Sequence, residues 1–199
     1  MPKQFVLATH NLHKVGELKA ILAAKLPEFA NGSAELIAYD GPEPVEDGTS
    51  FAENALIKAR AAFAHTGLPA IADDSGLTVD LLGGAPGIFS ARWSGAKDDA
   101  ANRRLLLAQL ADVKAEHRNA AFVCTMALVD ETTEATCTGV WQGSVARVES
   151  GENGFGYDPI FVPTGLTVSA ASLAPAEKNA ISHRAMAIEE LVAVLAPRL

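Results

Sequence analysis

The sequence has no long apolar run and almost no cysteine. No stretch reaches the ~18 apolar residues that a membrane-spanning helix needs, and the apolar run at residues 5–8 is too short for a signal peptide. The two cysteines, Cys124 and Cys137, stand thirteen positions apart without a second pair, a spacing that fits neither a zinc site nor a secreted disulfide framework. We therefore expect a cytoplasmic protein with reduced, buried thiols and no membrane partner.

Positive charge is also scarce. Sixteen lysines and arginines stand against 24 aspartates and glutamates, which leaves a formal net charge of −8. This balance excludes broad attraction to polymeric nucleic acid, so an anionic ligand has to be held by a few local cations. The 199 residues, 49% of them apolar, suffice for a sizeable core, and we expect a single domain over residues 1–199.

Short apolar runs alternate with segments of helical periodicity along the chain. We expect strands at residues 5–8, 35–39, 69–72 and 160–162, helices at 12–26, 50–65, 98–110 and 187–195, and an antiparallel meander at 120–148. Ser50 and Glu53 carry the signature of a capping box at the start of the second helix. This order predicts an α/β fold with a mixed β-sheet flanked by helices and bent into two lobes around a cleft, where small ligands usually bind.

A candidate phosphate site lies where the first strand passes into the first helix. Such a turn offers free backbone N–H groups and the positive end of a helix dipole, to which a hydroxyl, an amide and a lysine add donors. The segment is not a Walker loop, because it lacks the glycines and the Gly-Lys-Ser/Thr ending. The alternative is a simple helix cap, and two histidines without a third ligand do not favour a metal. The residues are Thr9, His10, Asn11, Leu12, His13 and Lys14.

Two adjacent carboxylates, Asp73 and Asp74, follow a predicted buried strand and precede Ser75 and a glycine. Carboxylates at a strand end are costly unless they face water, a cation or a metal such as Mg²⁺, which prefers oxygen ligands. Glu46, in the acidic loop before the second helix, could supply another oxygen ligand. The alternatives are an Asx-type turn for the pair and a solvated loop for Glu46.

On the second helix, Asn54 and Lys58 are four residues apart and share a face, so an amide and an ammonium can point together into a cleft. A solvated helix face is the alternative. Further along, Phe155, Gly156, Tyr157 and Asp158 alternate aromatics with glycine and end on a carboxylate. An exposed ring among small residues is what stacking on a planar base needs, and the alternative is that both rings cover a core edge.

Lys178, His183 and Arg184 concentrate potential positive charge ahead of the last helix of an acidic protein. Cations near a helix N-terminus are electrostatically disfavoured without an anionic partner. A surface salt-bridge cluster is the alternative to a ligand site. Together these candidates are a phosphate site, a pair of carboxylates for a metal, an aromatic ring for stacking and a basic cluster. This combination predicts a nucleoside phosphate as the ligand.

Six motifs together also resemble the noncanonical purine NTP pyrophosphatases, the inosine and xanthosine triphosphate pyrophosphatase family. The resemblance runs in one order from about residue 5 to residue 195. The motifs are Thr9-x-Asn11-x-x-Lys14, Phe51-x-Glu53-Asn54-Ala55, Ala72-Asp73-Asp74-Ser75-Gly76-Leu77, Gly83-Gly84-Ala85-Pro86-Gly87, Phe155-Gly156-Tyr157-Asp158-Pro159 and Ser182-His183-Arg184.

The resemblance implies a homodimer with an elongated two-lobed α/β fold that hydrolyses ITP, dITP or XTP between the α and β phosphates. The products are a nucleoside monophosphate and pyrophosphate, and the reaction, which depends on Mg²⁺, cleanses the nucleotide pool. Residues 9–14 would bind the triphosphate, Asp74 would accept a proton and bind the metal, and Glu46 would be a second metal ligand. Lys58 would lie near the phosphates and act in catalysis. The remaining residues implied to hold the substrate are Ser75, Phe155, Gly156, Tyr157, Asp158, Lys178, His183 and Arg184.

His10 departs from the family pattern, because many members carry glycine there. The backbone cradle is kept only if that position needs no positive φ. Two other functions stay open. A nucleotide-binding regulator would use the same cradle without hydrolysis, although a second carboxylate gains nothing there without a metal. A phosphomonoesterase with an aspartyl nucleophile would release inorganic phosphate.

Overall fold

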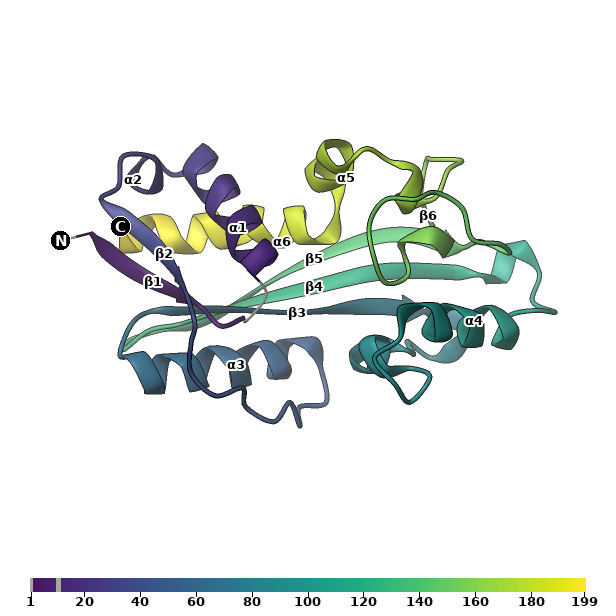
Figure 1. The fold of residues 1–199 in the computed structure, drawn as a ribbon, viewed down its shortest axis with the longest axis horizontal. Helices are drawn as coiled ribbons and strands as arrows, with labels where there is room; N and C mark the ends of the chain where they lie inside the picture. The colour runs from purple at the N-terminus through teal and green to yellow at the C-terminus, as the bar shows by residue number, and fades with distance from the viewer. Residues whose placement is uncertain (1, 10–11) are drawn as a thin grey trace. The chain divides into compact units, whose positions relative to one another are not determined.

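The computed structural model describes residues 2–9 and 12–199, and the side chains of residues 12–14 and 17 lie outside that description. The described residues form one six-stranded sheet in the order β2-β1-β3-β4-β5-β6 (Figure 1). The strands are β1 Lys3–Leu7, β2 Ala34–Ala38, β3 Ala70–Val79, β4 Asn119–Val129, β5 Glu134–Val145 and β6 Phe161–Pro163. The helices are α1 Leu12–Lys25, α2 Pro27–Ala30, α3 Phe51–Thr66, α4 Asp99–Gln109, α5 Pro175–Ile181 and α6 His183–Leu195.

The sheet is mixed, as predicted. β1 pairs in parallel with β2 and with β3, because a helical connection returns the chain to the same edge after each strand. β5 pairs antiparallel with β6. In the part of the chain that the structure describes, no helix is long and apolar enough to cross a membrane.

The chain divides into two compact units. Unit 1 comprises the chain up to Asp74 together with Thr125–Thr138 and Ala187–Leu199, and unit 2 comprises Ser75–Cys124 and Gly139–Met186. The boundary therefore falls between two consecutive residues of the acidic motif. A single functional domain over residues 1–199 and a cleft between two lobes stay predictions.

In unit 1, α3 covers one face of the strands (Figure 1). Small side chains make this contact, because Ala55 and Ala59 pack against Ala72 and two residues of β4. The helix begins at Ser50, whose hydroxyl accepts from the Glu53 amide at 3.2 Å. This cap and the alanine seam fix the rotation of α3, so that Asn54 is buried and Lys58 is half-buried.

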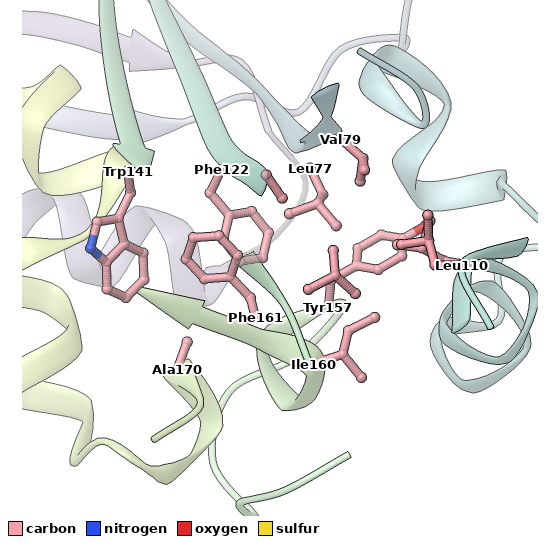
Figure 2. Packing of buried hydrophobic residues seen from close by; sticks show 12 residues of the cluster. Leu77, Val79, Leu110, Phe122, Trp141, Tyr157, Ile160, Phe161 and Ala170 are labelled. Carbon is pink, nitrogen blue, oxygen red and sulfur yellow. The ribbon is translucent and has the colours of Figure 1, made fainter. Parts of the chain in front are cut away.

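The core of unit 2 is aromatic. The rings of Phe122 and Phe161 meet edge to face with their centroids 4.7 Å apart, and in Figure 2 they lie between Trp141 and Tyr157. All four rings are buried. This core supports the loop around Tyr157 that the sequence analysis singles out.

One local prediction needs correction. The acidic motif does not follow a strand, because Asp73, Asp74 and Ser75 lie inside the ten-residue strand β3. β3 has β1 on one side and β4 on the other, but its pairing with β1 ends at Ile71. The strand therefore continues past the end of that pairing and past the point where side-chain polarity alone predicted its end.

Candidate active site

Unit 1 contains a polar pocket of about 200 Å³. Its lining includes Thr9, Glu46, Lys58 and Asp73, which are residues that the sequence analysis proposed for phosphate or metal. The strand ends, the acidic loop and α3 each contribute to it. The predictions for His10 and Asn11, and for the side chains of residues 12–14, fall outside the described part of the chain.

A single ammonium group contacts two carboxylates at this pocket. Lys58 Nζ lies 3.1 Å from Glu46 Oε1 and 3.6 Å from Asp74 Oδ1. The side chains of Lys58 and Asp74 are only 16% and 15% exposed, so solvent screens their attraction less than at an open surface. The structure thus brings together three residues that lie up to 28 positions apart in the sequence.

Asn54 links the acidic loop to Asp74. Its Oδ1 accepts from the backbone N–H of Gly48 at 3.0 Å, and its Nδ2 donates to Asp74 Oδ2 at 3.2 Å. The approach at Gly48 is so close that a Cβ there would lie 2.6 Å from Asn54 Oδ1. The amide is therefore held in one orientation, with its donor toward Asp74.

The environment of Asp74 favours its protonated form. Burial raises the pKa of the Asp74 carboxyl, and the charges of Glu46 and Asp73 add to that shift. Lys58 and the Asn54 amide oppose it. A buried carboxyl with a raised pKa beside a specific cation is typical of a proton-transfer group.

The donor set fits Mg²⁺. Glu46 and Asp74 both contact the Lys58 ammonium, which shows that their oxygens converge on a position where a cation is favourable. Among the side chains that the structure describes, no three His, Cys, Asp or Glu residues form a group that could hold a metal ion by themselves. Two carboxylates are nevertheless what Mg²⁺ takes from a protein when substrate phosphates supply further oxygens.

Unit 2 contains a second, more aromatic pocket of about 150 Å³. All eight residues that the sequence analysis assigned to substrate binding outside residues 9–14 line this aromatic pocket. They are Ser75, Phe155, Gly156, Tyr157, Asp158, Lys178, His183 and Arg184. The motifs are thus adjacent in space, and their roles in binding stay a prediction.

Within the aromatic pocket, Lys178 pairs with the buried carboxylate of Asp158 and lies over the ring of Phe155, 5.1 Å from its centroid. Asp158 also accepts from the Phe155 amide at 2.9 Å. On another wall, the His183 ring stacks on Phe122 at 4.9 Å with the planes 12° apart. The pocket therefore offers flat faces together with cationic groups.

Sequence reasoning missed Phe122 and Asp99, which line this pocket, and Arg103, which contacts its loop. Phe122 carries the His183 ring, while Asp99 and Arg103 bind the backbone of Gly156. The spacing of Asp99 and Arg103 on one helix face was a visible signal, but nothing in the sequence says what that face contacts.

Comparison with known proteins agrees with the motif pattern. The chain is 55% identical over 192 residues to the dITP/XTP pyrophosphatase of Leifsonia xyli subsp. xyli, covering 96% of this chain and 94% of that protein. It is 51% identical over 198 residues to the dITP/XTP pyrophosphatase of Streptomyces avermitilis, with 96% of each covered.

Solved structures also match over nearly the whole length. A HAM1 protein from Coxiella burnetii superposes with a TM-score of 0.88 at 42% identity, covering 98% of both chains. A nucleoside-triphosphatase / dITP/XTP pyrophosphatase from Mycobacterium abscessus superposes at 0.81 and 48% identity, covering 96% of this chain and 99% of that one. Residues 5–194 match the sequence model of the Ham1 family, so the resemblance is confirmed and the chain belongs to the Ham1 family.

Proposed function

We propose that this chain hydrolyses noncanonical purine nucleoside triphosphates (ITP, dITP and XTP) at the bond between the α and β phosphates. The products are the nucleoside monophosphate and pyrophosphate, and the reaction removes these nucleotides from the pool. The contact of Lys58 with both Glu46 and Asp74 carries the proposal. The dITP/XTP pyrophosphatases at 51–55% identity support it.

Each residue at the polar pocket has its own role in the proposed reaction. Asp74 accepts the proton of the water whose oxygen attacks the α phosphorus, while the bond to the bridging oxygen breaks and pyrophosphate leaves. Lys58 stabilises the negative charge that builds on the leaving group. Glu46 and Asp74 would hold Mg²⁺, which when bound neutralises phosphate charge and orients the reactants. Thr9 and Lys14 hold the triphosphate.

The aromatic pocket selects the base. Phe155 is 64% exposed, so its ring is available for stacking on a purine. Donors from Lys178, His183 or Arg184 would bond a 6-keto oxygen and oppose a 6-amino group. A buried donor left unpaired costs about 1–3 kcal/mol, which corresponds to roughly 5- to 150-fold against ATP.

Product analysis tests the reaction. The pure chain is incubated with ITP, XTP, ATP and GTP, with and without Mg²⁺, and the products are separated by ion-exchange chromatography. We expect monophosphate and pyrophosphate from ITP and XTP only when Mg²⁺ is present. Inorganic phosphate would point to a phosphomonoesterase, and tight binding without turnover to a regulator.

Matched variants test the assignment of the carboxylates. Asp74→Asn and Glu46→Gln should abolish or strongly reduce turnover while the fold is kept. Asp47→Asn changes the exposed neighbour of Glu46 and should leave the rate within about twofold, since surface substitutions usually have small effects. Turnover by Asp74→Asn at the wild-type rate would refute its role as proton acceptor.

We also propose that the chain acts as a homodimer. Sedimentation equilibrium should then give twice the chain mass of 20.8 kDa. A mass of one chain at the concentrations used for activity would contradict this part of the proposal.

A further inference from the structure

Side chains of α4 hold the central peptide of the loop at residues 154–158. Asp99 Oδ2 accepts from the Gly156 N–H at 2.8 Å, and Arg103 Nη1 donates to the Gly156 carbonyl at 2.8 Å. Asp99 and Arg103 are four residues apart and lie on one face of the helix. Both polar groups of one backbone residue are therefore bound by a single helix turn.

The two side chains are themselves held in place. Asp99 is the first residue of α4, where the helix dipole favours a carboxylate, and the preceding Asp98 caps the helix by accepting from Ala101 N at 3.0 Å. Arg103 Nε lies 3.1 Å from Glu149 Oε2, and the Arg103 side chain is only 15% exposed. The pair can thus act as a fixed support for the loop.

Gly156 stands between the two aromatic residues of the loop, and its φ of 59° is in the left-handed region. Tyr157 is anchored separately, because its ring is buried and its hydroxyl donates to the Ser90 carbonyl at 2.9 Å. Phe155 is exposed, its amide donates to Asp158, and Lys178 lies over its ring. The Gly156 peptide is the next link of the chain, so holding it restricts the backbone from which the Phe155 ring projects.

We propose that Asp99 and Arg103 are positioning residues, which set the Phe155 ring for stacking on the purine base by holding the Gly156 peptide. The inference rests on the proposed function, because it takes a purine nucleotide as the ligand of the aromatic pocket. Arg103 does not line the aromatic pocket; Asp99 does, and the Asp99→Asn variant separates its support of Gly156 from a direct effect of its charge on the nucleotide. Asp99 needs only an acceptor oxygen, so an asparagine at this position can replace it.

The test measures base binding and phosphate binding separately. Calorimetry gives Kd for inosine monophosphate and for pyrophosphate, and steady-state kinetics give KM and kcat for ITP. We expect Asp99→Ala and Arg103→Ala to raise Kd for inosine monophosphate and KM about tenfold, since each loses its hydrogen bond to the Gly156 peptide. The Kd for pyrophosphate and kcat should change less than about twofold, because the phosphate-binding residues are untouched. Asp99→Asn should stay close to wild type.

Two controls separate positioning from a general loss of structure. Arg104→Ala removes an exposed arginine from the same helix turn without touching Gly156 and should keep wild-type Kd and KM. Asp98→Ala removes the cap that holds the first turn of α4, so its effect should lie between wild type and Asp99→Ala. The inference is overturned if Arg104→Ala matches Asp99→Ala, or if Asp99→Asn loses as much as Asp99→Ala, because the carboxylate charge would then act on the ligand itself.

The wild-type chain distinguishes the two proposals. Binding of inosine monophosphate without release of pyrophosphate from ITP would overturn the proposed reaction. The positioning role would then be decided by the Kd values of the variants alone. An unchanged Kd in Asp99→Ala, in an active enzyme, would overturn the positioning role alone. Failure of the wild-type chain to bind inosine monophosphate at all would overturn both.

Discussion

We expect the variant Asn54→Ala, which loses the amide, to keep more catalytic activity than Asn54→Asp, which replaces the amide by an acid of the same shape. The two ends of its amide face Gly48 N and Asp74 Oδ2, at 3.0 and 3.2 Å, and the residue is only 2% exposed. Asn54→Asp keeps the shape and the acceptor for Gly48. It replaces the donor that faces Asp74 by a second carboxylate oxygen.

The magnitude follows from the distance. Two unit negative charges 3.2 Å apart repel by about 5 kcal/mol at an effective dielectric constant of about 20. Holding a proton at pH 7 on a carboxyl with a pKa of about 4 costs about 4 kcal/mol. Because the repulsion exceeds this cost, the two carboxyls of Asn54→Asp share one proton at neutral pH. Burial, which already raises the pKa of Asp74, acts in the same direction.

A shared proton disables Asp74 as a proton acceptor, so the rate of Asn54→Asp at pH 7 should fall by about 100-fold or more. Asn54→Ala adds no negative charge beside Asp74 and should lose less activity. It leaves the half-buried Gly48 N–H without this acceptor, whereas Asp74 loses one donor and keeps its contact with Lys58. The free energy of unfolding should therefore fall by about 1–3 kcal/mol.

Pyrophosphate release between pH 6 and pH 9 and urea unfolding test this contrast. The rate of Asn54→Asp should recover as the pH rises and the shared proton leaves. The pH profile of Asn54→Ala should move in the same direction but by less, because the variant loses the amide that lowers the pKa of Asp74 without adding a charge. An Asn54→Asp variant that matches or exceeds Asn54→Ala in activity at pH 7 would refute the reasoning.

Three further predictions concern stability, each measured by urea unfolding. Burial raises the pKa of Asp74, so the folded chain binds more protons than the unfolded chain between the two pKa values. The contribution of Asp74 to stability therefore falls as the pH rises through that window, and Asp74→Asn should flatten this slope. Gly76→Ala should lower the free energy of unfolding by about 1–3 kcal/mol, because the added Cβ would meet the Ser90 hydroxyl and lie 2.6 Å from the Gly87 carbonyl oxygen. A wild-type unfolding midpoint would contradict this close packing. Arg118→Met should lower the free energy of unfolding by about 3 kcal/mol or more, since the buried guanidinium donates to three backbone carbonyls. An unchanged free energy of unfolding would show that water replaces those bonds.

Local signals in the sequence predicted the elements that local chemistry specifies. Ser50 and Glu53 placed the start of α3, and the helix ends at Gly67 with a φ of 68°, where a residue without a Cβ is favoured. The spacing of Asn54 and Lys58 predicted a shared face, and both side chains contact Asp74. These features depend on residues at most four positions apart, so the local sequence pattern is sufficient to predict them.

The extent of β3 and the support of Gly156 could not be predicted in this way. Asp73 and Asp74 continue a strand that is central in the sheet, beyond the end of its pairing with β1 at Ile71, and position in a sheet is a tertiary property that overrides local propensity. Arg103 reaches a glycine 53 positions further along the chain. From the sequence, two charged residues on one helix face are equally consistent with a face exposed to solvent. Only the folded structure shows that this face contacts Gly156.

The charges of the polar pocket lead to a last prediction about its ligands. Counting only the described side chains, Glu43, Glu46 and Asp73 line the polar pocket and Asp74 lies beside it, against the ammonium of Lys58. Four carboxylates and one ammonium leave a formal charge of −3, so a polyphosphate without a counterion would be repelled. A divalent cation between carboxylates and phosphates reverses this balance. Removal of Mg²⁺ with EDTA should therefore weaken pyrophosphate binding about tenfold or more, while inosine, which carries no phosphate, should keep its affinity for the aromatic pocket. Calorimetry with each ligand checks this, and equal weakening of both would mean that metal removal acts on the fold instead of on the phosphate site.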